Sequence, residues 1–208
     1  MEKRLRTYNV IGAILVFIGM PLLLYGIGEF PRRSILKETI SLLTLLALSM
    51  MLGQFYFARS NYVLLKIHKF IGYFFVVILL VHPFSVVFPR YFESGVEPKD
   101  AFLTLITSFN RLGVLLGMLA YGTLLVISLT SYFRDKLAMS YKTWRLFHGT
   151  LSIVFIGFAS WHAINLGRHI NKPLSFFILI LAILGVLLLL NIYFSNSSKK
   201  LEENKCQK

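Results

Sequence analysis

The chain has 208 residues, of which 56% are hydrophobic and only 15% are charged. A water-soluble domain could not hide that much apolar surface, so we predict an integral membrane protein. The formal net charge of +13 is expected to hold the chain to anionic lipid, and no nucleic-acid partner is predicted because no soluble basic module is present. The single cysteine, Cys206, excludes disulfides, iron–sulfur clusters and cysteine-ligated zinc within one chain.

Six apolar stretches are long enough to cross a hydrocarbon core about 30 Å thick. In chain order they are Tyr8–Phe30, Thr39–Tyr56, Ile67–Phe88, Leu112–Phe133, Phe147–Leu166 and Leu174–Phe194. The segments between them carry the proline, asparagine and charged residues that are typical of loops. The sequence therefore predicts an all-α, six-helix membrane bundle over residues 1–194 and a short charged tail over 195–208. The first stretch is expected to be a retained helix, because it is too long for a cleaved signal peptide.

Lysine and arginine predict how these helices are oriented. Most of them lie at the N-terminus, in the second and fourth loops and in the C-terminal tail, whereas most acidic residues lie in the other loops. Because basic loops stay in the cytoplasm, both termini are predicted to be cytoplasmic, with the chain in the plasma membrane. The third and fifth predicted helices then run parallel, from the cytoplasm outward.

Four of the five histidines form two pairs with one spacing. His68 and His82 lie fourteen residues apart, and so do His148 and His162. Fourteen residues make almost four helical turns, so each pair shares a helix face over about 21 Å. The predicted orientation brings His68 level with His148 on the cytoplasmic side and His82 level with His162 outside. Hydrogen-bonded core histidines are the alternative, but the shared register favours two bis-histidine haem sites and electron transfer across the membrane.

An aromatic residue lies halfway between the two ligands on each histidine helix. Phe75 and Phe155 are each seven residues from the ligands of their helix, which places them on the same face. We expect Phe155 above all to pack between the two haems and to shorten the gap that electrons cross. Ordinary apolar packing is the alternative in a chain with 19 phenylalanines.

Cations and small residues near the histidines are predicted to contact the haems. Arginine suits a carboxylate, so Arg145 is expected to bind the propionates of the inner haem and Arg111 those of the outer haem. Membrane anchoring is the alternative for Arg145, whereas Arg111 lies on the side that should be poor in basic residues. Gly72 and Gly149 are expected to leave room for a porphyrin edge beside the inner ligands, although tight helix packing explains them nearly as well.

The sequence resembles the ferric reductase-like transmembrane domain. The resemblance rests on a Tyr-Lys-x-Trp-Arg-x-x-His-Gly run at Tyr141–Gly149, a Leu-x-x-His-Lys-x-x-Gly-Tyr run at Leu65–Tyr73 and the repeated spacing of the histidines. It covers roughly Thr39 to Phe194. It implies b-type haems bound by the four histidines. It also implies electron flow from cytoplasmic NAD(P)H, through flavin, to an acceptor outside.

The chain departs from the large members of that family, which include eukaryotic ferric reductases and NADPH oxidases. Those proteins continue into a cytoplasmic flavin and nicotinamide domain, whereas this chain stops fourteen residues after Phe194 and has no Gly-x-Gly-x-x-Gly motif after a strand. We therefore expect a ferric reductase-type oxidoreductase component with FAD or FMN only on a separate partner. Its donor is expected to be a cytoplasmic flavin reductase or a membrane electron carrier.

The acceptor is expected to be a small ferric chelate, drawn to the outer face by Arg111, Arg168 and His169. No catalytic side chain and no carboxylate site for iron is predicted. Two alternatives keep the haems: a periplasmic protein as acceptor, as for the haem-bearing subunit of methionine sulfoxide reductase, or an oxidase that makes superoxide. The first is less favoured because that subunit lacks one of the four histidines.

Two further alternatives belong to other classes of protein. Dihaem cytochrome b of bc-type complexes has the same histidine spacing, but on its second and fourth helices. A transporter or structural membrane protein would contain the histidines by chance and would be colourless. A proton-coupled transporter would also be expected to carry acidic residues inside its spans, and none lies well inside the six stretches.

Overall fold

The computed structural model describes residues 11–28, 34–57, 62–107, 111–167 and 170–206. These ranges are helical and contain no strand, which confirms the predicted all-α class. The helical elements are η1 (Leu15–Gly19), α2 (Met20–Ile27), α3 (Ile35–Phe57), α4 (Tyr62–Ser94), α5 (Pro98–Thr107), α6 (Leu112–Tyr132), η3 (Arg134–Lys136), α7 (Tyr141–Leu166) and α8 (Lys172–Cys206).

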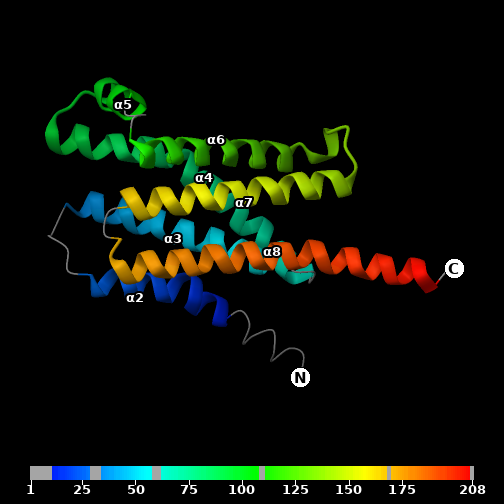
Figure 1. The fold of residues 1–208 in the computed structure, drawn as a ribbon. Helices are drawn as coiled ribbons and strands as arrows, with labels where there is room; N and C mark the ends of the chain where they lie inside the picture. Colours follow the sequence, from blue (N-terminus) through cyan, green and yellow to red (C-terminus); the bar gives the residue numbers. More distant parts are fainter. Residues whose placement is uncertain (1–10, 29–33, 58–61, 108–110, 168–169, 207–208) are drawn as a thin grey trace.

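The long helices lie side by side and alternate in direction (Figure 1). α2, α4 and α7 run one way, and α3, α6 and α8 run the other way. α6 packs along α7, and α3 packs along both α4 and α8. The two histidine helices, α4 and α7, are therefore parallel, as the distribution of lysine and arginine predicted.

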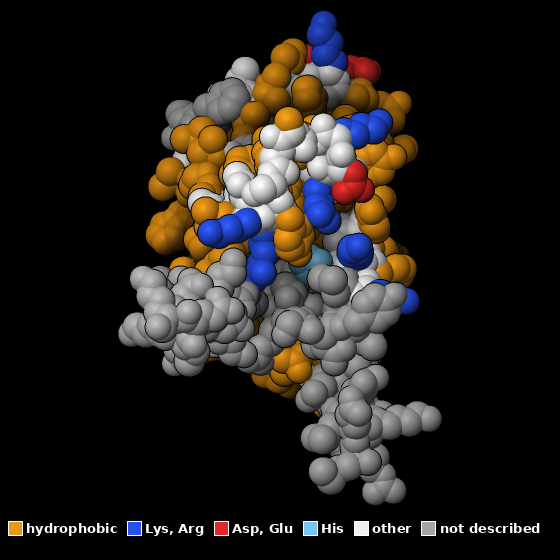
Figure 2. All heavy atoms as spheres, turned by 90° about the vertical axis from the view of Figure 1, so that its right-hand side faces the viewer, with side chains coloured by type: hydrophobic (Ala, Val, Ile, Leu, Met, Phe, Trp, Pro, Cys, Tyr) orange, Lys and Arg blue, Asp and Glu red, His pale blue; other side chains and the backbone are white. Residues whose placement is uncertain are grey.

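Lysine and arginine side chains gather at the end of the bundle where α6 turns into α7 (Figure 2). One histidine side chain is visible among them on this face. We call this the basic end, and its cations from described residues are Lys66, Lys69, Arg134, Lys136, Lys142 and Arg145. α4 and α7 both begin at the basic end, so the first histidine of each helix lies nearer to it than the second.

Five helices are long and apolar enough to cross a membrane, and they match the last five predicted spans. They are Ile35–Tyr56, Lys66–Ser94, Leu112–Tyr132, Tyr141–Leu166 and Lys172–Asn191. The first predicted span, Tyr8–Phe30, corresponds to a shorter apolar helix over Ile11–Ile27. The chain is thus a multi-pass helical membrane protein, and a sixth crossing stays a prediction.

The core lies where α3, α7 and α8 meet. Phe55, Ile156 and Ile178 are almost fully buried there. Large apolar side chains also cover the outside of the bundle, and Phe70 and Phe176 are 73% and 65% exposed. Such an apolar surface is unsuited to water but suits contact with lipid chains.

The short helix α5 was not predicted. Pro98 and the charged residues beside it interrupt the apolar pattern, which is typical of a loop. Proline in the first turn and an early acid, Asp100, are nevertheless ordinary signals for the start of a helix. Ala101 is 1% exposed and fixes α5 against the rest of the bundle. α5 lies at the end opposite the basic end (Figure 1).

A glycine ends α4 and allows the chain to turn toward α5. Gly95 has a φ of 65°, a left-handed conformation that glycine adopts without strain. The N–H groups of Gly95 and Val96 donate to the carbonyl oxygens of Tyr91 and Arg90. This pattern caps the last carbonyls of a helix that has continued through Pro83 and Pro89.

Candidate functional site

The second histidines of α4 and α7 face each other. The ring centroids of His82 and His162 lie 6.4 Å apart, and their planes form an angle of 82°. With metal–nitrogen bonds of about 2 Å, two imidazoles on opposite sides of one metal have ring centroids about 6 Å apart. The separation of this outer pair therefore fits two ligands of a single metal.

The first histidines of α4 and α7 form a second pair at the basic end. His68 and His148 are close enough that a positive charge on one ring would repel a charge on the other. This inner pair and the outer pair are the pairings that the sequence predicted. Among the described residues, α4 and α7 do not pack tightly along their backbones. They meet through ring side chains, an arrangement compatible with planar groups between the helices.

Three of the four imidazoles are held by an oxygen atom on a neighbouring helix. The contacts are His68 Nδ1 to Gln54 O at 3.2 Å, His162 Nδ1 to Gly113 O at 2.8 Å, and His148 Nδ1 to Ser131 Oγ at 3.1 Å. A carbonyl oxygen only accepts, so His68 and His162 carry their proton on Nδ1. Their Nε2 atoms then have a free lone pair, which is the form in which histidine binds a metal.

His82 differs from the other three histidines. Its Nδ1 atom is buried and has no hydrogen-bond partner among the described residues. A buried polar atom without a partner is costly, and such atoms often mark the place where a further group binds. The imidazole of His82 is thus positioned by packing and by its partner ring.

Two glycines of α6 contact the ring of His162. Gly113 supplies the carbonyl that binds the ring, and a Cβ atom at Gly117 would overlap the ring itself. A Cβ atom at Gly113 would also meet Leu166 at 2.8 Å. This contact was not predicted, although Gly-x-x-x-Gly in an apolar helix is a known signal for close helix packing.

Two aromatic rings lie between the inner pair and the outer pair. Phe75 and Phe155 are 4% and 5% exposed, and their centroids are 6.1 Å apart in an edge-to-face arrangement. They fill the space between α4 and α7 halfway between the histidine levels and leave little room for water there. Their role in electron transfer stays a prediction.

A stack of aromatic rings leads from the inner pair to the basic end. The Trp144 ring lies 5.1 Å from that of His148 at an angle of 29°, and Tyr141 stacks on Trp144 at 6.0 Å. The Arg134 guanidinium lies over both rings, 4.6 Å from the Tyr141 centroid and 5.2 Å from the Trp144 centroid. Trp144 was missed as a site residue, although it precedes His148 by four residues and therefore shares its helix face.

Arg145 and Gly149 have neighbours that the sequence did not predict. The Tyr193 hydroxyl of α8 donates to the backbone oxygen of Arg145 at 2.5 Å, and the Arg145 guanidinium lies 5.6 Å from the Tyr193 ring. A Cβ atom at Gly149 would overlap Tyr193. Gly149 thus makes room for Tyr193 rather than for a porphyrin edge. Among the described residues, Gly72 has no such tight neighbour: a Cβ atom there would meet the Gln54 side-chain nitrogen at 3.6 Å, an ordinary contact.

Among the remaining predicted cations, Arg111 lies at the opposite end of the bundle. Arg111 precedes α6 as an exposed residue. It is far along α6 from the basic end and on the side of the outer pair. Arg168 and His169 lie outside the described residues.

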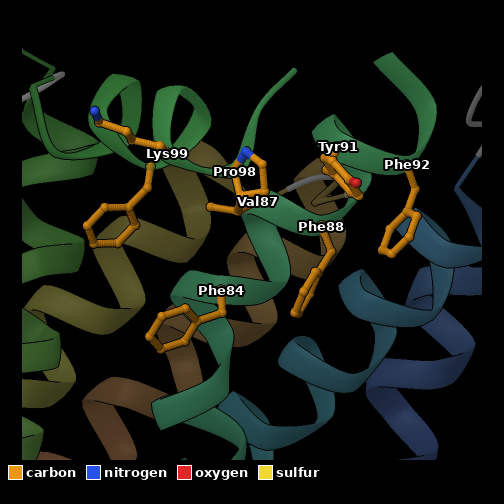
Figure 3. A pocket seen from close by; sticks show the side chains of 8 residues that line it. Phe84, Val87, Phe88, Tyr91, Phe92, Pro98 and Lys99 are labelled. Atoms are coloured by element: carbon orange, nitrogen blue, oxygen red, sulfur yellow. The ribbon is translucent and has the colours of Figure 1, made fainter. Parts of the chain in front are cut away.

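A hollow of about 590 Å³ opens between the end of α4 and α5 (Figure 3). Its lining is almost entirely apolar and consists of Phe84, Val87, Phe88, Tyr91, Phe92, Pro98, Lys99 and Phe102. The rings of Phe84 and Phe102 are nearly parallel, with centroids 6.5 Å apart. Phe84 follows His82 by two residues on α4, so the hollow lies at a similar level along α4, but on a different face of the helix from His82.

The donor set limits which group the pairs can hold. In the described ranges, no three residues among His, Cys, Asp and Glu gather as ligands of a bare metal ion. Each level offers two imidazoles on facing helices. Two axial nitrogens are what a low-spin haem requires, because the porphyrin supplies the other four ligands. The residues present therefore fit haem better than a free ion.

The arrangement defines a class, a helical membrane protein with paired histidines at two levels. Within that class, the chain belongs to the ferric reductase like transmembrane component family, whose profile matches residues 38–159. This range contains three of the four histidines, and His162 lies three residues beyond it. The family indicates electron transfer across the membrane.

One relative is an uncharacterized protein of Archaeoglobus fulgidus. It is 34% identical over 161 residues, which cover 73% of this chain and 87% of that protein. No solved structure matches the chain.

Proposed function

We propose that the protein carries electrons across the plasma membrane through two b-type haems. The inner haem would be held by His68 and His148, and the outer haem by His82 and His162. The observation that carries this proposal is the separation of 6.4 Å between the outer rings, together with carbonyl partners that leave Nε2 of His68 and His162 free. When bound, each haem supplies a centre that gains or loses one electron.

The residues around the histidines prepare them as ligands. A carbonyl that accepts from Nδ1 fixes the orientation of the ring and makes Nε2 a stronger donor to the metal. Gly113 does this for His162, and Gln54 does it for His68. Phe75 and Phe155 keep water out of the space between the levels. These features favour haems that change oxidation state with little rearrangement of the protein.

The direction of electron flow follows from the charge of the two ends. The positive-inside rule assigns the basic end to the cytoplasm. Its lysines and arginines would steer an acidic donor toward the inner pair. We propose a separate cytoplasmic flavin reductase or a membrane electron carrier as this donor, with FAD or FMN bound there and not on the chain.

We propose a small ferric chelate as the acceptor at the opposite end. Exposed cations on that side, Arg111 and Lys99, would attract an anionic chelate. A lipid-soluble quinone is the second candidate. It is favoured by the apolar lining of the hollow that begins two residues after His82.

Lipid vesicles that contain the protein and an internal donor would test this function. With NAD(P)H alone inside, we expect the haems to stay oxidised, and adding a flavin reductase inside should reduce them. Ferric citrate outside should then reoxidise them faster than oxygen or a quinone does. Faster reoxidation by quinone or oxygen would overturn the ferric acceptor. Rapid reduction by NAD(P)H without reductase would overturn the separate donor.

A further inference from the structure

We propose that Trp144 and Arg134 bind a propionate of the inner haem. This inference rests on the proposed function and assigns a role to two residues that the histidine pattern does not include. Trp144 lies one helical turn from His148 toward the basic end, and its ring is stacked on the imidazole. A haem bound by His148 would have its edge beside Trp144. Carboxylates are costly in hydrocarbon, so the propionate edge should face the basic end.

The indole nitrogen of Trp144 is a buried donor without a partner among the described residues. Its Nε1–H group is buried and makes no hydrogen bond with any described residue. Buried tryptophan N–H groups normally have an acceptor, because an unsatisfied donor costs free energy. The indole N–H group donates and cannot accept, so a group that binds beside it must offer a lone pair. A carboxylate at this position satisfies that requirement.

Arg134 supplies the positive charge that a carboxylate needs. Its guanidinium lies 5.2 Å from the Trp144 centroid and comes from η3, in the turn between α6 and α7. Arg145 follows Trp144 directly, but its guanidinium is turned toward Tyr193 on α8. Hydrogen bonds to a charged acceptor are stronger than neutral ones. Trp144 and Arg134 together thus form a better propionate site than Arg145 alone.

The test compares haem with its dimethyl ester, in which the propionates are neutral. The outer site is first removed by His82→Ala, so that only the inner haem is measured. Apoprotein is then loaded with either compound, and the affinity is read from the absorbance of the bound haem. The variant is Trp144→Phe, which keeps a ring beside His148 but loses the N–H group. The matched control is Trp161→Phe, which alters the only other tryptophan, a half-exposed residue next to His162.

The chain without further changes and the Trp161→Phe control should bind haem about tenfold more tightly than the ester. Trp144→Phe should lose about threefold of this preference, because the hydrogen bond from the indole is gone while Arg134 remains. Arg134→Gln, at an exposed position, should also reduce the preference, and it decides the question if Trp144→Phe does not fold. A full preference for haem in both variants would overturn the inference. Failure of every form to bind either compound would instead overturn the proposed function.

Discussion

Replacing His82 or His162 with alanine should remove the outer haem and leave the inner haem in place. The two histidine pairs, which we propose as separate ligand sets, lie at different levels of α4 and α7, with the buried rings of Phe75 and Phe155 between them. With one of these imidazoles removed, a single histidine would remain to hold the proposed outer haem, so the haem content should fall from two per chain to one. Pyridine haemochrome analysis of the purified variants measures this ratio.

His169→Ala is the control for that experiment, because His169 is the one histidine outside the two pairs. It should keep both haems. The inner pair provides the complementary variants, since His68→Ala and His148→Ala should keep the outer haem. If any single substitution in either pair removed both haems, the two sites would not be independent ligand sets.

Gly117→Ala should disrupt the outer site although it changes no ligand. The new methyl group would overlap the His162 ring, which is held by the Gly113 carbonyl on the same helix. The ring must then leave its position beside the Gly113 carbonyl. We expect loss of the outer haem and a stability decrease of about 1–3 kcal/mol, the usual cost of overpacking. Haem content and thermal unfolding measure the two effects.

Gly122→Ala is the matched control on α6. A Cβ atom at Gly122 meets nothing within 4 Å. Alanine favours helix over glycine by about 1 kcal/mol, so this control should be neutral or slightly stabilising. Gly117→Ala gains the same helix preference and should nevertheless lose stability and haem. If both variants kept the same haem content and stability, α6 would not hold the His162 ring in position.

The spans and the pairing of the histidines could be predicted from the sequence because their signals are local. A run of apolar residues identifies a span, and a spacing of fourteen residues places two histidines on one helix face. The charges of the loops then predicted that α4 and α7 are parallel. That orientation brings His82 level with His162, as the structure shows.

The contacts that hold the histidine rings could not be predicted in the same way, because they depend on which helices become neighbours in the fold. Nothing near Gly149 indicates that Tyr193, on α8, fills the space beside it. The oxygen that binds His68 is a backbone carbonyl of α3, and any residue at that position would supply the same atom. Gly113 and Gly117 did carry a packing motif, but only the contact with α7 connects it with His162.

The haem content of the purified protein tests the central proposal most directly. Two b-type haems per chain should be found, with the narrow reduced-minus-oxidised bands of low-spin iron that has two nitrogen ligands. Both should be lost from a variant in which all four paired histidines are alanine. A colourless protein after expression with sufficient haem, or a four-histidine variant that keeps its haem, would contradict the proposal.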